Sequence, residues 1–118
     1  MTLNYLHKKF VVVSDLATRK PLEIFFADGL PDMHSDIFAE AKKRWKKLGK
    51  DVIVNGGGRF SVIDNNIVFY GASQAFGRFE NDVVAVLAKQ HALFSNDKFK
   101  IICKAGREDP WELIEENN

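Results

Sequence analysis

The order of apolar and polar residues along the chain predicts strands that alternate with two amphipathic helices. Short runs rich in β-branched and aromatic residues, bounded by turn-forming residues, are typical of strands. Six runs fit this description: Lys9–Val13, Leu22–Ala27, Asp51–Asn55, Arg59–Ile63, Ile67–Tyr70 and Phe99–Lys104. Residues 64–66 between two of these runs predict a tight hairpin turn, and residues 29–32 predict a loop.

Two segments change to helical spacing. From Ser35 to Leu48 the apolar residues form one stripe, and Gly49 follows as a stop signal. A second amphipathic run extends from Asn81 to Leu93, with Asn81 or Asp82 near its cap. Residues 110–114 predict a short C-terminal turn. Together these elements predict an α/β (α+β) fold, in which residues 1–118 form one domain with a mixed sheet of about six strands and two main helices.

Charge and composition narrow the classes of function. The 118 residues include 17 basic and 16 acidic side chains, a balance that argues against a dedicated nucleic-acid binder. The basic residues at 42–47 could contact nucleic acid or an acidic partner, although a solvated helix face explains them as well. No apolar run approaches the ~20 residues of a membrane span, and the N-terminus lacks the order of a secretory signal. We therefore expect a cytoplasmic protein that binds neither membrane nor nucleic acid.

The sequence gives little evidence for a metal site or for a disulfide. Cys103 is the single cysteine, so an internal disulfide and a multi-cysteine metal site are excluded. It lies in a strand-like run and is best interpreted as a structural thiol. No two of the three histidines have metal-ligand spacing. We expect neither a metal nor a cofactor.

The segment Tyr70 to Gly77 is a candidate anion site. Its small residues leave the backbone unshielded, and it joins a strand to the second predicted helix. Amide groups at the positive end of a helix dipole bind anions, phosphate above all. This reasoning places the site at the start of the second helix.

His34 is the candidate proton carrier. It lies at the start of the first helix, where the helix dipole disfavours the imidazolium and a neutral ring could act as a base. The alternative is a surface histidine near a helix cap.

The run Gly56-Gly57-Gly58 lacks the spacing of a nucleotide-binding phosphate loop and is followed by strand-like residues. It favours a close approach of two backbones or a bulge. The next residue, Arg59, could hold an anion or a buried carboxylate, and its position between strands favours a structural role.

Three segments together resemble the small phosphohistidine phosphatases of the Janus/Ocnus family. They are Met33-His34-Ser35-Asp36-Ile37-Phe38, Val54-Asn55-Gly56-Gly57-Gly58-Arg59-Phe60 and Asn66 to Gly77, in the family's order and spacing. The similarity extends from about Lys9 to Lys104. It implies a monomeric, metal-free phosphatase that hydrolyses the P–N bond of histidine-phosphorylated proteins, and of small phosphoramidates such as phospholysine.

The resemblance also assigns roles. The family's catalytic histidine falls on His34, and its phosphate-holding loop on Ser73, Gln74 and Ala75. Its substrate-binding lysine falls on Lys9, and its arginine after the glycines on Arg59.

The chain departs from the family pattern in three ways. Asn81 stands where animal members have a second histidine, Gln74 replaces a methionine and Phe76 replaces a tyrosine. The alternative function is therefore a non-catalytic module that binds phosphate or phosphoproteins on the same fold.

Overall fold

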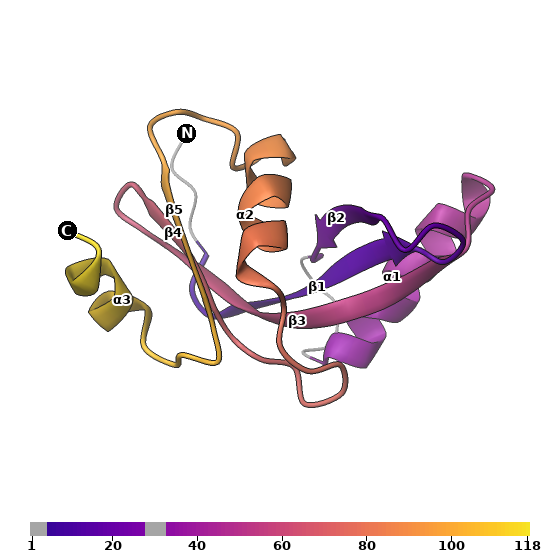
Figure 1. Cartoon of the computed structure of the whole chain (residues 1–118), viewed down its shortest axis with the longest axis horizontal. Coiled ribbons are helices and arrows are strands. Elements are labelled where there is room, and N and C mark those ends of the chain that lie inside the picture. The colour runs from indigo at the N-terminus through magenta and orange to yellow at the C-terminus, as the bar shows by residue number, and fades with distance from the viewer. Residues whose placement is uncertain (1–4, 28–32) are drawn as a thin grey trace.

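A computed structural model of the chain describes residues 5–27 and 33–118, which form one five-stranded sheet and three helices (Figure 1). The strands follow the order β2-β1-β3-β4-β5 across the sheet. Their bounds are β1 Lys8–Asp15, β2 Pro21–Phe25, β3 Val52–Ile63, β4 Asn66–Gly71 and β5 Lys100–Ala105. Neighbours are antiparallel except β4 and β5, which are parallel and are joined through a helix. The loop predicted at 29–32 lies outside the described residues.

The predicted α+β class and mixed sheet are confirmed, but the prediction of six strands is wrong. The two runs expected on either side of the glycines form a single strand, β3, which continues through all three glycines. The expected hairpin connects β3 to β4, with Asp64 in the left-handed region at φ 54°.

The short turn expected near the C-terminus is a third helix, α3, at Pro110–Glu116. The side chain of Asp109 accepts hydrogen bonds from the backbone amides of Trp111 and Glu112, and Pro110 occupies the first turn. A capping side chain followed by proline is a strong helix start.

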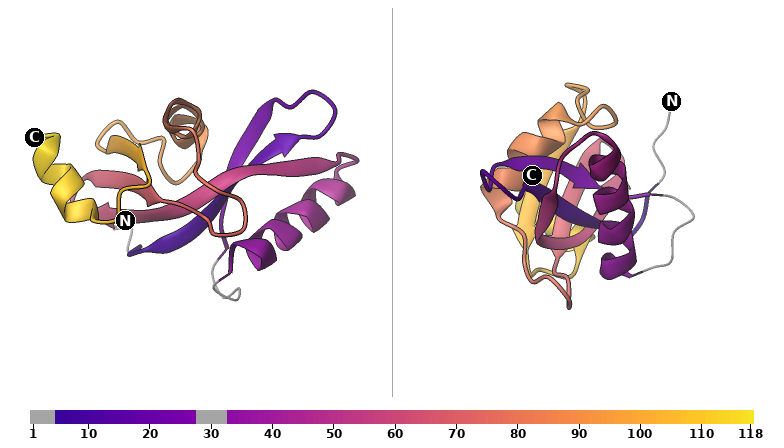
Figure 2. Two further views of the ribbon diagram at one scale, coloured as in Figure 1. Left: turned by 60° about the horizontal axis from the view of Figure 1, so that its bottom comes forward. Right: turned by 90° about the vertical axis from the view of Figure 1, so that its right-hand side faces the viewer.

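The two longer helices, α1 at His34–Lys47 and α2 at Asn81–Gln90, cover opposite faces of the sheet (Figure 2). Side chains of a strand alternate between faces, so Val11 and Val13 pack with Ile37 of α1, while Phe10 and Val12 face the α2 cluster. Helix α3 covers the β4 and β5 end of the α1 face through Leu113. None of the helices within the described residues is long and apolar enough to span a membrane.

A β-bulge in β3 determines which side chains reach the α1 face. Val11 is opposite Gly57 and Val13 is opposite Val54, so Asn55 and Gly56 together face one residue of β1. The extra residue reverses the alternation along β3. Val54 and Arg59 consequently lie on the same face, although an odd number of positions separates them.

The glycines of β3 also allow other segments to approach its backbone. A Cβ atom on Gly56 would lie 2.3 Å from the carbonyl oxygen of Arg78, and one on Gly58 would lie 2.5 Å from that of Tyr70. The segment after β4 therefore crosses directly over β3, with the amide of Gly57 donating to the carbonyl of Gly77 at 3.2 Å. The structural interpretation of the glycine run is confirmed.

This geometry predicts that Gly56→Ala is strongly destabilising. Gly56 has φ +85° and its new Cβ would overlap backbone, so we expect a loss of about 2–4 kcal/mol in the free energy of unfolding. Gly49→Ala is the matched control, because Gly49 has φ +78° with nothing within 4 Å of an added Cβ. It should lose only about 1 kcal/mol. Equal losses in urea or thermal unfolding would contradict the role of close backbone approach.

Candidate active site

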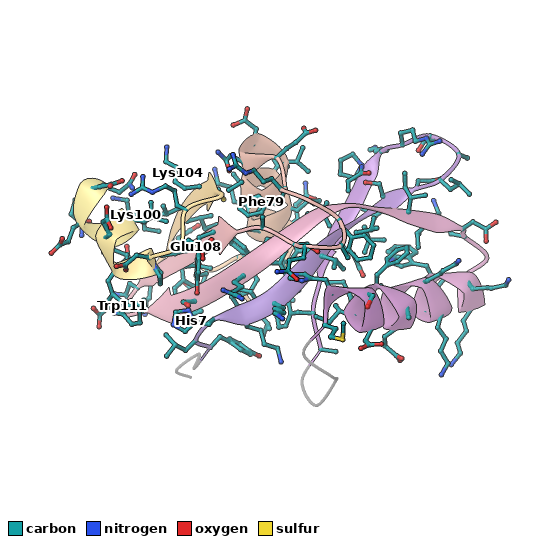
Figure 3. All side chains as sticks on the ribbon, turned by 90° about the horizontal axis from the view of Figure 1, so that it is seen from below. His7, Phe79, Lys100, Lys104, Glu108 and Trp111 are labelled. Carbon is teal, nitrogen blue, oxygen red and sulfur yellow. The ribbon has the colours of Figure 1, made fainter. Side chains whose placement is uncertain are left out.

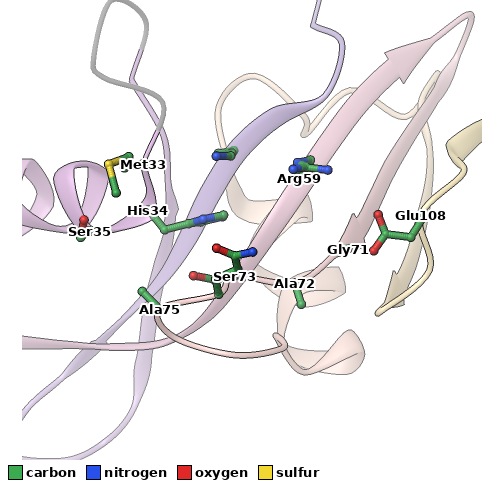
Figure 4. A pocket seen from close by; sticks show the side chains of 11 residues that line it. Met33, His34, Ser35, Arg59, Gly71, Ala72, Ser73, Ala75 and Glu108 are labelled. Carbon is green, nitrogen blue, oxygen red and sulfur yellow. The ribbon is translucent and has the colours of Figure 1, made fainter.

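A cavity of about 780 Å³ opens on the α1 face of the sheet, toward the end that α3 covers (Figure 4). Four regions of the chain contribute to it: the start of α1, strands β1 and β3, the segment that follows β4, and the segment between β5 and α3. The lining residues are Lys9, Met33, His34, Ser35, Arg59, Gly71, Ala72, Ser73, Gln74, Ala75 and Glu108.

The cavity brings together all but one of the residues singled out from the sequence. His34, Lys9, Arg59 and the segment Ser73 to Ala75 all line it. Asn81 does not. Its side-chain oxygen accepts a hydrogen bond of 2.8 Å from the amide of Ala105, which ties the start of α2 to the end of β5. The asparagine in place of a second histidine therefore removes nothing from the cavity wall.

His34 is the first residue of α1 and is only 8% exposed, so the alternative of a surface histidine is wrong. Its Nε2 lies 2.9 Å from the carbonyl oxygen of Gly58. A carbonyl can only accept, so Nε2 carries the proton and donates it. In the neutral ring Nδ1 is then the unprotonated nitrogen, which can act as a base.

The position of the His34 ring depends on Gly57. A Cβ atom at Gly57 would lie 3.1 Å from Cδ2 of His34 and 3.4 Å from Cβ of Ser73. The missing side chain thus lets the imidazole and the segment after β4 pack on the same part of β3.

The segment from Ser73 to Gly77 forms a closed turn. The amide and carbonyl of Ser73 pair with the carbonyl and amide of Gly77, and the hydroxyl of Ser73 accepts from the amide of Phe76 at 3.1 Å. The amides of Gln74 and Ala75 donate to no group of the described residues, and both residues are exposed at the cavity. Turn amides without a protein partner are the kind of group that binds anions.

The helix dipole at this site is not the one that the sequence suggested. The cap of α2 is Glu80, five residues beyond Ala75, so the turn does not open α2. Instead the start of α1 faces the cavity through His34 and Ser35. The positive end of this 14-residue helix therefore supplements the turn amides.

Two cations lie side by side on the floor of the cavity. Lys9 of β1 and Arg59 of β3 are directly opposite each other in the register, a spacing of about 5 Å between their Cβ atoms. The guanidinium of Arg59 forms no hydrogen bond or ion pair with any described residue, so the structural role expected for it is not supported. Two cations on opposed residues can both pair with an anion that lies between them.

Sequence reasoning gave no role to Met33, Ser35 and Glu108, whereas Gly71 and Ala72 lie within the segment Tyr70 to Gly77 that it identified. Met33 and Ser35 flank His34, so their position next to it in the sequence could have identified them. Glu108 follows β5 in an ordinary run of charged residues, and only the parallel pairing of β4 with β5 brings it to the cavity.

The remaining titratable groups lie elsewhere. Burial lowers the pKa of His91, which packs with Phe26 and Phe94 on the α2 face. Burial raises the pKa of Cys103 to about 12, so its thiol stays protonated and is no nucleophile at neutral pH. Within residues 5–27 and 33–118, no three His, Cys, Asp or Glu side chains are grouped as a metal site.

Comparisons with known proteins agree with the resemblance noted in the sequence. A search of curated proteins found no match. The Janus/Ocnus family (Ocnus) matches residues 7–97, which include Lys9, His34, the glycines of β3 and the whole turn after β4. The matched part covers well over half of the chain, and the chain belongs to the Janus/Ocnus family.

Proposed function

We propose that the protein is a metal-independent phosphatase that hydrolyses the P–N bond of phosphohistidine in proteins, and of phospholysine. One observation carries the proposal. A histidine with a fixed tautomer, two cations on opposed strand positions and the turn that contains the Gln74 and Ala75 amides all line the same cavity. The family resemblance adds the P–N bond as the target.

The anion groups would hold the phosphoryl oxygens. Lys9 and Arg59 balance the negative charge from the sheet, and the amides of Gln74 and Ala75 donate from the turn. The Gln74 side chain adds a polar amide at the exposed rim. Phosphoryl transfer depends mainly on such positioning and charge stabilisation, because the reacting group itself needs little covalent help.

His34 would activate the attacking water. Nδ1 takes a proton from the water as its oxygen bonds to phosphorus, and the P–N bond breaks on the opposite side. The leaving imidazole or amine keeps the bonding electron pair and takes a proton from solvent. Donation from Nε2 to Gly58 keeps Nδ1 unprotonated until it accepts the proton of the water, which the ring then loses to solvent. Direct attack of Nδ1 on phosphorus is a second route, and it would produce a phosphorylated His34.

A non-catalytic phosphoprotein-binding module is the alternative. Two departures from the family pattern motivate it, at Gln74 and Asn81. Since Asn81 lies outside the cavity, only Gln74 alters the site itself. An intact cavity that binds phosphate but never releases it from a phosphoramidate would favour the module.

The first prediction of this proposal concerns His34. With EDTA present, the wild type should release phosphate from phosphohistidine peptides, and His34→Ala should lower kcat by roughly 10²–10⁴-fold. The variant should still bind inorganic phosphate, because the turn amides, Lys9 and Arg59 remain.

His91→Gln is the matched control, since His91 lies on the α2 face away from the cavity. It should retain wild-type kcat. Unchanged turnover in His34→Ala, or equal losses in both variants, would contradict the assignment. A phosphorylated His34 trapped by rapid quench would indicate the nucleophilic route.

The second prediction concerns Lys9. As a point charge that contacts phosphate in both ground and transition states, Lys9 should mainly affect binding. We expect Lys9→Ala to raise KM about tenfold or more with a smaller loss in kcat. Lys8→Ala is the control, because strand alternation points Lys8 to the other face of the sheet. Steady-state kinetics with a small phosphoramidate decide this, and an unchanged KM would remove Lys9 from the site.

The third prediction concerns the guanidinium of Arg59. Arg59→Met removes its charge and keeps the apolar stem. Without phosphate, the variant should be about as stable as the wild type, because the guanidinium has no hydrogen bond or ion pair with any described residue. It should gain less in Tm than the wild type when phosphate is added. A large loss of stability without phosphate would restore the structural role for Arg59.

A further inference from the structure

The cavity has an acidic end, formed by the segment between β5 and α3. Most charges of this segment have partners: Arg107 pairs with Glu112 at 3.1 Å and with Glu116 at 2.7 Å, and Asp109 caps α3. Glu108 alone among these residues lines the cavity, and its carboxylate has no hydrogen bond or ion pair within the described part of the chain. A carboxylate thus opens onto a site whose other charges are positive.

Backbone hydrogen bonds fix this carboxylate relative to the phosphate-binding turn. The amide of Gly71 donates to the carbonyl of Arg107 at 2.6 Å, and the amide of Gly106 donates to the carbonyl of Gly71 at 2.7 Å. Gly71 is the last residue of β4, two positions before the turn begins at Ser73. Gly71 therefore connects the segment that carries Glu108 to the start of the turn.

The register of the sheet gives the scale of the site. Lys9, Arg59, Tyr70 and Lys104 form one row across β1, β3, β4 and β5. Adjacent strands lie about 4.8 Å apart, so the acidic end is roughly 10–15 Å from Lys9. In Figure 4, His34 and Glu108 lie at opposite ends of the cavity with Arg59 between them. Lys104 continues the row but does not line the cavity.

An exposed aromatic ring follows this carboxylate three residues further along the chain, at the start of α3 (Figure 3). Trp111 lies in the first turn of α3 and is 49% exposed. The centroids of the Trp111 and His7 rings are 5.7 Å apart in an edge-on arrangement. Nδ1 of His7 forms a hydrogen bond with the hydroxyl of Tyr70, which is fully buried. The indole is thus held in place while much of its surface faces solvent.

A carboxylate three residues before a held indole supplies the two groups of a cation site. Lysine and arginine side chains pair with carboxylates and pack against the faces of tryptophan rings. We propose that Glu108 and Trp111 form a subsite for a basic side chain of the phosphorylated protein. This proposal rests on the proposed function in one respect, that the phosphoryl group occupies the His34 end.

The subsite defines a class of substrate. A phosphoryl group at the cationic end and a basic group roughly 10–15 Å away match an extended peptide with Lys or Arg about four residues from the phosphorylated one, because a strand rises about 3.3 Å per residue and residues an even number of positions apart project on the same side. The protein should prefer phosphohistidine in basic sequence surroundings over the same residue among neutral neighbours.

Peptide binding tests the subsite without requiring turnover. Two peptides carry a hydrolysis-resistant phosphohistidine analogue and differ only in Arg or Ala four residues away, on either side. Their Kd values are measured by calorimetry for the wild type, Glu108→Gln, Trp111→Leu and Glu115→Gln. Glu115 is the matched control, an exposed carboxylate of α3 that does not line the cavity.

We expect the wild type and Glu115→Gln to bind the Arg peptide about tenfold more tightly than the Ala peptide. Glu108→Gln should abolish most of this preference and Trp111→Leu part of it, and added salt should weaken it. Equal Kd values in the wild type, or a preference that survives Glu108→Gln, would overturn the subsite.

Phosphate release from the matching phosphohistidine peptides separates this inference from the proposed function. An Arg preference in binding, lost in Glu108→Gln, supports the subsite even if neither peptide is hydrolysed. In that event the phosphatase proposal fails and the binding module takes its place.

Discussion

The absence of side chains at residues 56–58 of β3 is the constraint on which the rest of the site depends. A Cβ atom at Gly56 or Gly58 would overlap other backbone segments. A Cβ atom at Gly57 would crowd the carbonyl of Phe10, the ring of His34 and the side chain of Ser73. The same run contains the bulge that reverses the alternation of β3 and turns Arg59 toward Lys9. The close approach of other segments to β3 and the direction of the Arg59 side chain thus both result from the glycine run, and both shape the cavity.

The charges of the cavity follow from this arrangement. Two cations on opposed strands, together with the start of a 14-residue helix, bring groups that attract an anion to one place. In its neutral form the ring of His34, which donates from Nε2 to Gly58, adds no charge and places a base among these groups.

Much of this could be predicted from sequence because the signals are local. Periodicity identified the helices α1 and α2 and the runs that form the sheet. The small residues of the segment Tyr70 to Gly77, together with His34 and Arg59, indicated the site. The errors all involve nonlocal geometry. Nothing in the sequence near Gly57 reveals that β3 continues through the glycines, because only pairing with β1 extends it. The anion-binding helix start proved to be that of α1, since α1 and α2 cover opposite faces.

Glu108 illustrates the same limit on prediction from sequence. It is separated from the turn by an entire helix and a strand, and the parallel pairing of β4 with β5 alone returns the chain to the cavity. A charged residue in an exposed loop carries no local mark of such a position. The cap formed by Asp109, by contrast, could be recognised from the proline that follows it.

Titration of ¹⁵N-labelled protein with inorganic phosphate, followed by NMR, tests the central claim most directly, because it observes both the anion site and the histidine tautomer. The account predicts shifts of the Gln74 and Ala75 amides, with His34 protonated at Nε2 and its Nδ1 signal responding to phosphate. Shifts confined to the basic residues 42–47 of α1, or a His34 protonated at Nδ1 in the neutral ring, would contradict it.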